Sequence, residues 1–100
     1  MIYITQLIYL KPGKEEVFDE FEAVAIPLIY KYDGVLLFRI RPEKSNVIAA
    51  DERVPYEIHL VKFPGEDNFH MFMKDEERKN FLHLKEQSIE SVVLIKGNTL

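Results

Sequence analysis

The sequence contains no cysteine among its 100 residues. This absence excludes disulfide bonds, zinc sites built on thiolates and a cysteine nucleophile. The four glycines are scattered along the chain, so there is no glycine-rich loop of the kind that binds nucleotide phosphates. No apolar run approaches the length of a membrane-spanning helix, and the first residues lack the pattern of a secretory signal. We therefore expect a cytoplasmic protein without a membrane partner.

An excess of basic charge is also lacking. The chain has 13 Lys and Arg against 17 Asp and Glu, a formal net charge of −4, and no basic stripe stands out, so we do not expect nucleic-acid binding. The three histidines, His59, His70 and His83, do not have metal-ligand spacing, so we expect no metal site. No motif indicates an organic cofactor. The length and the 47% hydrophobic content predict one globular domain over residues 1–100.

The hydrophobic pattern predicts the element order β-α-β-β-α-β. The strands are expected at residues 2–10, 35–41, 56–63 and 91–96, a first helix at 14–32, and a second helical region from residue 69 to about 84. This order predicts an α+β fold, the ferredoxin-like plait, with a four-stranded antiparallel sheet and both helices on one face. Right-handed crossovers place the first and third strands in the middle of the sheet.

The two faces of this sheet differ in polarity. We expect the more aliphatic set beneath the helices, because burial without polar partners costs least there: Ile2, Ile4, Gln6, Ile8, Leu10, Leu36, Phe38, Ile40, Ile58 and Leu60. Gln6 is the polar exception in this set. The opposite face would then carry Tyr3, Thr5, Leu7, Tyr9, Leu37, Arg39, Arg41, Glu57, His59, Val61 and Phe63.

This second face is too apolar to stand open to water. We therefore expect two copies of the chain to pack these faces together about a two-fold axis. The predicted partner is thus a second copy of the chain, and Glu57 and His59 would line the interior of the homodimer.

Glu57 and His59 are the main candidates for chemistry. They lie two residues apart on one strand, which places their Cα atoms about 7 Å apart on the same face. Either side chain could act as a general base, with Arg39 or Arg41 stabilising the resulting anion. The alternative is that Glu57 pairs with Arg39 across the hairpin as a structural ion pair.

Aromatic residues complete the candidate site. Tyr3 and Tyr9 could present their hydroxyls to a ligand or fill the dimer interface with their rings, and Phe63 ends the strand that carries Glu57 and His59. Away from this site, Asp75 is expected to cap a helical turn and to form a local ion pair with Arg78.

Three parts of the sequence resemble the dimeric α+β barrel superfamily, and within it small uncharacterised proteins of the DUF1330-like kind. They are KPGKEEVFDEF (11–21), IYKYDG (29–34), and PYEIHLVKFPGEDNFHMFMKDEER (55–78) followed by FLHLKEQSI (81–89). The resemblance implies a homodimer with facing sheets and a cleft in each subunit between the sheet and the helices or loops. It does not extend to the monooxygenases of the superfamily, because Phe63 stands where their pattern has tryptophan.

Two functional hypotheses follow. In the first, the protein is an enzyme or binder of a small aromatic or anionic metabolite, working without an organic cofactor. In the second, it is a non-catalytic homodimeric interaction or regulatory module, in which the same residues stabilise the interface.

Overall fold

The computed structural model describes all residues from 1 to 100. Its elements follow the predicted order, with the second helical region divided into short helices: β1 (Ile2–Leu10), α1 (Glu15–Lys31), β2 (Val35–Ile40), a 3₁₀ turn (Lys44–Asn46), β3 (Glu57–Phe63), α2 (Glu66–Met73), α3 (Glu76–Asn80), α4 (Leu82–Ser88) and β4 (Ile89–Gly97). None of the helices is long and apolar enough to cross a membrane.

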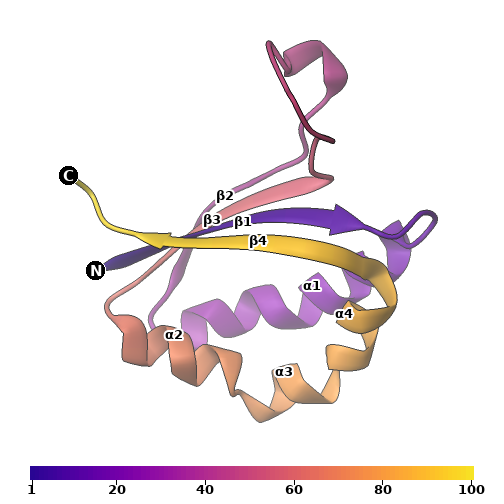
Figure 1. Cartoon of the computed structure of the whole chain (residues 1–100). Coiled ribbons are helices and arrows are strands. Elements are labelled where there is room, and N and C mark those ends of the chain that lie inside the picture. Colours follow the sequence, from indigo (N-terminus) through magenta and orange to yellow (C-terminus); the bar gives the residue numbers. More distant parts are fainter.

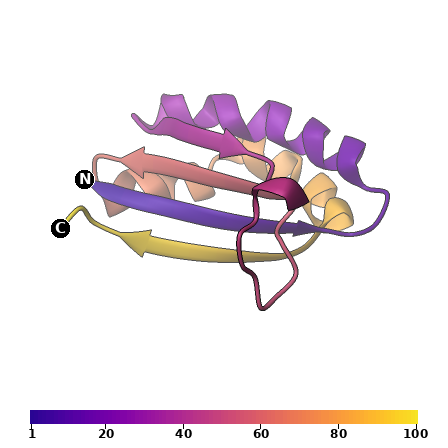
Figure 2. The ribbon, with the colours of Figure 1, turned by 90° about the horizontal axis from the view of Figure 1, so that it is seen from above.

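The four strands form one antiparallel sheet in the order β2-β3-β1-β4. The central positions of β1 and β3 are as predicted, and the arrangement is the ferredoxin-like fold. All the helices cover one face of the sheet (Figure 1). The connection from β2 to β3, residues 41–56, projects from the opposite side, as Figures 1 and 2 show. We call this segment the arm.

The core lies between the sheet and the helices. Ile4, Val61 and Phe63 of the sheet pack against residues of α1 and α2, and the Phe63 ring lies 5.7 Å from the ring centroids of both Phe69 and Phe72. The buried stripe of α1 has the three- and four-residue steps of an amphipathic helix and comprises Phe18, Phe21, Glu22, Ala25, Leu28 and Ile29. One carboxylate therefore lies on an otherwise apolar helix face.

The predicted facing of β3 is wrong. Its register with β1 pairs Glu57 with Ile8 and Val61 with Ile4, so the set Glu57, His59, Val61 and Phe63 faces the helices and is buried. Ile58 and Leu60 face the other way. The physical reason is that Val61 and Phe63 supply the apolar burial at one end of the strand, while polar partners compensate the burial of the other end.

The predicted facing of β2 is wrong in part, because the strand contains a bulge. The register shifts between Leu36 and Phe38 and places Arg39 opposite His59. Beyond the bulge, Arg39 and Arg41 reach α1 on the helix side. Phe38 and Ile40, expected beneath the helices, point away from them and are more than half exposed.

The side of the sheet away from the helices, here called the outer face, is consequently more apolar than predicted. Tyr3, Thr5, Leu7 and Tyr9 lie on it as expected, but Glu57 and His59 do not, so they cannot line the interior of a dimer built on this face. The register places the following residues on the outer face: Tyr3, Thr5, Leu7, Tyr9, Val35, Phe38, Ile40, Ile58, Leu60, Lys62, Ser91, Val93 and Ile95. Lys62 is the one charged residue among these.

Candidate functional site

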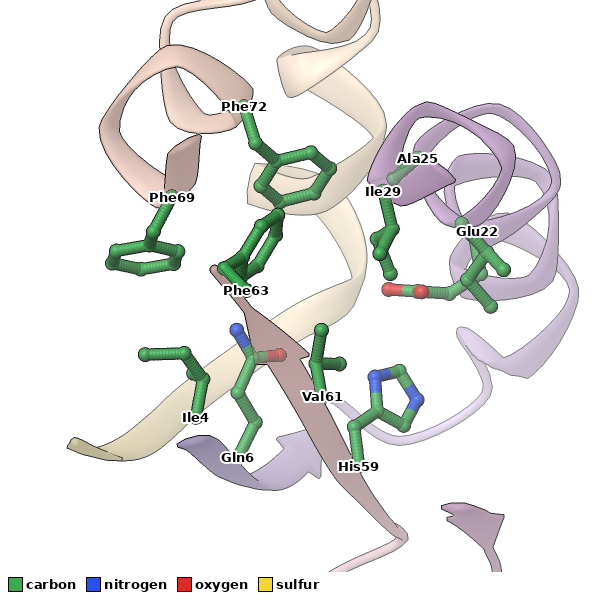
Figure 3. A pocket seen from close by; sticks show the side chains of 11 residues that line it. Ile4, Gln6, Glu22, Ala25, Ile29, His59, Val61, Phe63, Phe69 and Phe72 are labelled. Carbon is green, nitrogen blue, oxygen red and sulfur yellow. The ribbon is translucent and has the colours of Figure 1, made fainter. Parts of the chain in front are cut away.

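A small cavity lies between the sheet and the helices. Its volume is about 40 Å³, enough for about two or three water molecules. Apolar side chains form most of its wall, and three polar side chains, Gln6, Glu22 and His59, face into it. Gln6 was the unexplained polar residue of the helix-facing set, and its place beside this cavity accounts for it. Figure 3 shows the Glu22 carboxylate pointing from α1 toward the space above Val61, with the His59 ring below it.

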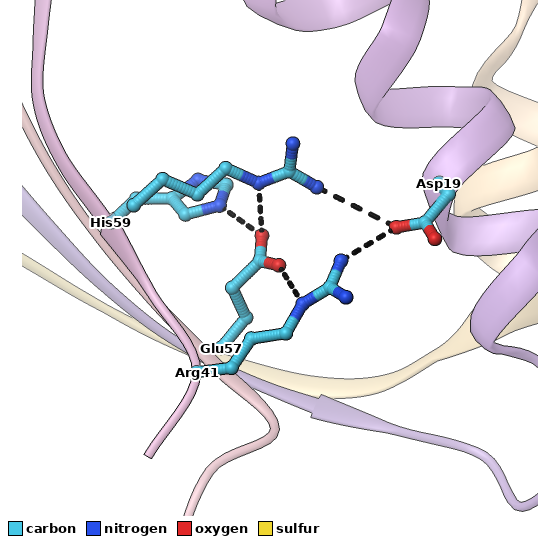
Figure 4. Close-up of polar contacts among 5 residues, drawn as sticks. Asp19, Arg41, Glu57 and His59 are labelled. Carbon is cyan, nitrogen blue, oxygen red and sulfur yellow. Dashed lines mark hydrogen bonds and ion pairs between the residues drawn. The ribbon is translucent and has the colours of Figure 1, made fainter.

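Glu57 anchors the polar end of this region. Its side chain is fully buried and accepts hydrogen bonds from Arg39 Nε at 2.9 Å and Arg41 Nε at 2.8 Å, and it also bonds Nε2 of His59 (Figure 4). Burial alone would raise the pKa of this carboxyl, but the bonds from His59, Arg39 and Arg41 lower the pKa to about 2. Glu57 is therefore ionised and fully engaged, and it is not available as a general base.

The state of Glu57 determines how the protons of His59 are arranged. An ionised carboxylate can only accept hydrogen bonds, so Nε2 of His59 must carry the proton that it shares with Glu57. In the neutral imidazole the lone pair then lies on Nδ1, which forms no hydrogen bond within the protein and belongs to a ring that lines the cavity. A carboxylate that fixes the tautomer and orientation of an imidazole is a recurrent arrangement in proton-transfer sites.

Glu22 is the second titratable group of the cavity. It is 7% exposed, and burial raises the pKa of its carboxyl, an effect that a protonated His59 would partly oppose. Its carboxylate has no ion-pair partner, unlike that of Glu57. A buried acid with a raised pKa beside an oriented imidazole gives the cavity one proton donor and one proton acceptor.

The two arginines also reach α1. The Nη2 atoms of Arg41 and Arg39 lie 2.8 Å and 3.5 Å from Oδ1 of Asp19. The Arg41 guanidinium stacks on Tyr56, 5.0 Å from the ring centroid. Two guanidinium groups thus connect a buried carboxylate on β3 to a half-exposed carboxylate on α1.

The structure brings together four of the predicted site residues. His59, Glu57, Arg39 and Arg41 form one network, and it includes the ion pair of Glu57 with Arg39 that the sequence offered as the alternative to a catalytic Glu57. Phe63 lies in the same cavity as His59, two residues beyond Val61.

Tyr3 and Tyr9 do not join this network. Both lie on the outer face, because their positions in β1 alternate with Ile4 and Ile8, which are buried beneath the helices. The Tyr9 ring instead lies 4.9 Å from the guanidinium of Arg53 in the arm. Their assignment to one ligand site with His59 is therefore wrong.

Two residues of α1 that lie at the candidate site, Asp19 and Glu22, were not predicted from the sequence. A signal for Glu22 was present, because it occupies a position on the apolar stripe four residues after Phe18. No comparable signal marks Asp19, which lies among other exposed acidic residues of the helix.

Asp75 caps α3 as predicted, but its expected ion pair with Arg78 is wrong. The Asp75 carboxylate accepts a hydrogen bond from the backbone N–H of Arg78 at 3.0 Å and from Lys31 and Tyr32 at the end of α1. The Arg78 guanidinium packs instead over the rings of Phe72 and Phe21.

The histidines do not converge on a metal site. His70 and His83 are exposed on α2 and α4, and no three side chains of the His, Asp or Glu type lie close enough to hold a metal ion.

No protein-family model matches the chain, and no curated protein matches it either. Solved structures do resemble it. A protein of unknown function from Rhodopseudomonas palustris superposes with a TM-score of 0.81 at 16% identity, covering 99% of this chain and 82% of that one. A DABB family protein with a ferredoxin-like fold from Mesorhizobium loti gives a TM-score of 0.67 at 15% identity, covering 99% and 96% of the two chains.

A third similar structure is that of a protein from Bacteroides fragilis, described as dimeric, of unknown function and with a ferredoxin-like fold. It gives a TM-score of 0.68 at 12% identity and covers 98% of this chain and 95% of its own. At these identities the likeness establishes the fold alone. The predicted ferredoxin-like fold is confirmed, while the narrower DUF1330-like resemblance stays a prediction.

Proposed function

We propose that this protein catalyses proton transfer on a small carbonyl compound bound in the cavity between the sheet and the helices. His59 would be the base and Glu22 the acid. One observation carries the proposal. The network of Glu57 with the two arginines holds the His59 ring through Nε2. The Nδ1 lone pair is therefore free, and it lies in the same cavity as the Glu22 carboxylate, which has no ion-pair partner.

The proposed step is the removal of a proton from a carbon next to a carbonyl group. The C–H bond breaks as its proton moves to Nδ1 of His59, and the electron pair moves onto the carbonyl oxygen as an enolate. Protonated Glu22 then gives its proton to that oxygen. Returning the two protons regenerates both side chains, so the step needs no cofactor. A raised pKa suits Glu22 to this role, because the carboxyl keeps its proton to a higher pH.

Glu57 and Arg39 act through His59 in this proposal. Glu57 is a positioning residue that holds the imidazole and supports the imidazolium formed during the reaction. Arg39 lies opposite His59 in the adjacent strand and compensates the buried charge of Glu57. The small volume of the cavity favours the most compact of the small aromatic or anionic ligands considered from the sequence.

Deuterium exchange tests this proposal without knowledge of the natural substrate. Small enolisable ketones and oxo acids are incubated with the protein in heavy water, and the loss of their α-proton signals is followed by NMR. We expect exchange above the buffer rate, and a loss of roughly 10²–10⁴-fold in His59→Asn, the range usual for a positioned general base.

Glu22→Gln separates the acid role from the base role. It should reduce exchange while leaving the His59 tautomer, read from the imidazole ¹⁵N shifts, unchanged. Glu20→Gln is the matched control, because Glu20 is an exposed acid of the same helix. If the wild type exchanged none of the tested ketones and oxo acids faster than the buffer, or if His59→Asn kept full exchange, the proposed proton transfer would be rejected. The alternative of a non-catalytic module would then be favoured.

We also propose that the protein is a homodimer formed through the outer face. The exposed apolar residues of this face support it, among them Phe38 and Ile40 of β2 and Val93 and Ile95 of β4. Soluble monomers seldom leave such a patch open. The resemblance to dimeric α+β barrels and the B. fragilis structure, described as dimeric, support the same assembly.

The surface area of the chain is consistent with this assembly. The accessible surface is 6580 Å², whereas a folded monomer of 11.8 kDa is expected to expose about 5,900 Å². The chain therefore exposes about 700 Å² more than an average monomer of its mass, as a chain with an uncovered interface would. Light scattering after size-exclusion chromatography tests the proposal, and a monomer at micromolar concentration would reject it.

A further inference from the structure

We propose that Arg39 and Arg41 form a binding site for the carboxylate of a small organic acid, and that Asp19 occupies this site within the chain when no ligand is bound. The inference deepens the proposed function, on which it rests, because it names the substrate class. It depends on the arrangement of two carboxylates around two guanidinium groups.

The two guanidinium groups are positioned without the help of Asp19. Each uses its Nε atom to bind the buried carboxylate of Glu57, at 2.9 Å for Arg39 and 2.8 Å for Arg41. Arg41 is further restrained by stacking on Tyr56. Because the inner contacts fix the planes of both groups, their Nη atoms remain directed outward as a preorganised pair of donors.

Asp19 binds the guanidinium groups of Arg39 and Arg41 through contacts that a ligand can replace. A single oxygen of its side chain contacts Arg41 Nη2 at 2.8 Å and Arg39 Nη2 at 3.5 Å (Figure 4). The Asp19 side chain is half exposed, and ion pairs of such exposure are weak. Arg39, Arg41 and Glu57 border an open hollow of about 350 Å³, so a ligand can approach from solvent.

The charge balance indicates a single carboxylate as the ligand. The positive charges of Arg39 and Arg41 are balanced by one negative charge on Glu57 and one on Asp19. An incoming monoanion that displaces Asp19 restores this balance, whereas a dianionic phosphate exceeds it. The planar fork of arginine also matches the geometry of a carboxylate.

The position of this site joins it to the proposed chemistry. Arg39 is the cross-strand partner of His59, and Glu22 follows Asp19 by three residues on the same side of α1, a rise of about 4.5 Å. A carboxylate in the place of Asp19 would therefore put the next carbons of a short acid beside His59 and Glu22. The substrate class is a small oxo acid whose carboxylate binds the arginines.

A binding experiment with unreactive probes tests the inference. Butyrate and its neutral analogue butyramide are titrated into the wild type, Asp19→Asn and Glu20→Gln, and the Nε–H signals of the arginines and the imidazole signals of His59 are followed by NMR. Asp19→Asn should bind butyrate roughly tenfold more tightly than the wild type, as expected when the site is otherwise free about one-tenth of the time. Butyramide affinity should not change.

Glu20→Gln removes the same charge from a neighbouring exposed position, so an equal gain in both variants would overturn the inference. Unmoved arginine signals with butyrate in Asp19→Asn would also overturn it, as would tighter binding of inorganic phosphate than of butyrate. If butyrate moves the arginine signals but not those of His59, the carboxylate site stands and the proposed function fails. If both probes move His59 and neither moves the arginines, the proposed function stands and the carboxylate site fails.

Discussion

Glu57 is a residue whose burial would be costly if it stood alone. A buried carboxylate is tolerated when charged donors surround it, and this one accepts from two arginines and a histidine. The same donors that compensate its burial also place His59. Stability and the arrangement of the candidate site therefore depend on one side chain.

Glu57→Gln should destabilise the protein and make its stability less dependent on pH in the acid range. We expect the free energy of unfolding to fall by roughly 2–4 kcal/mol at pH 7, below the upper range for buried pairs because Arg41 is half exposed. The pKa of Glu57 is depressed from 4.5 to about 2, so its stabilisation is present above pH 4.5 and is lost as the pH falls toward 2. Urea unfolding across this range should show a steeper decline in the wild type than in Glu57→Gln, with Glu20→Gln matching the wild type.

Glu22→Gln should have the opposite effect on stability. Burial raises the pKa of Glu22, so any stabilisation relative to the unfolded chain exists at low pH and is lost as the pH rises through the folded-state pKa. At pH 7 the burial of the Glu22 carboxyl therefore costs stability, and the neutral amide of glutamine does not carry this cost. We expect the free energy of unfolding of Glu22→Gln to exceed that of the wild type by about 1 kcal/mol at pH 7, a gain within the usual range for stabilising substitutions. Below pH 4.5 the two proteins should be equally stable. Thermal melts at pH 7 and below pH 4.5 measure this difference. If Glu22→Gln were no more stable than the wild type at pH 7, the raised pKa of Glu22 would be contradicted.

At the scale of elements, the sequence was sufficient for the order and pairing of strands but not for the facing of two of them. The periodicity identified β1 correctly, and the crossover rule placed it beside β3. In β3 an alternating pattern left two faces to choose from, and the choice depended on partners contributed by other elements. Charged neighbours from β2 made the polar end of β3 compatible with burial.

The bulge in β2 was not predictable for a related reason. One extra residue between Leu36 and Phe38 moves each later side chain of β2 to the opposite face of the sheet. Nothing in the strand sequence VLLFRI indicates where this bulge lies. The four candidate residues Glu57, His59, Arg39 and Arg41 do lie together. The predicted site was placed on the wrong side of the sheet, and for that reason it lacked both acids of α1.

The turn from α1 to β2 provides a prediction at this scale. In this turn Asp33, and not the glycine that follows it, adopts a positive φ, at 63°. Gly34 is required for space instead, because a Cβ atom there would lie 2.6 Å from a ring carbon of Phe63 and 2.7 Å from Ile29. Gly34→Ala should cost about 1–3 kcal/mol in urea unfolding, the range for overpacking.

Gly97→Ala is the matched control for this substitution, because nothing lies within 4 Å of its added Cβ. It should change the free energy of unfolding by less than about 0.5 kcal/mol. Equal effects of the two substitutions would show that packing against Phe63 does not set the requirement for glycine.

At the scale of the whole molecule, the helices protect one side of the sheet and leave the other uncovered (Figure 1). The arm projects on this uncovered side, and Arg53 holds its base by pairing with Glu90 at 3.2 Å and by stacking on Tyr9. Ile48, within the arm, is fully exposed. In the proposed dimer, a second copy packed on the outer face would also lie beside the arm and Ile48.

Phe38→Lys should therefore shift the assembly toward monomers. Phe38 is 61% exposed in the single chain, so the fold should tolerate lysine, whereas a two-fold interface would receive the new charge twice. We expect the dimer dissociation constant to rise by at least roughly 100-fold, equivalent to about 2.8 kcal/mol, as measured by sedimentation over a concentration series. Met71→Lys introduces the same charge at a residue of similar exposure in α2 and should leave the assembly unchanged. A dimer that survives Phe38→Lys but not Met71→Lys would place the interface on the helices instead.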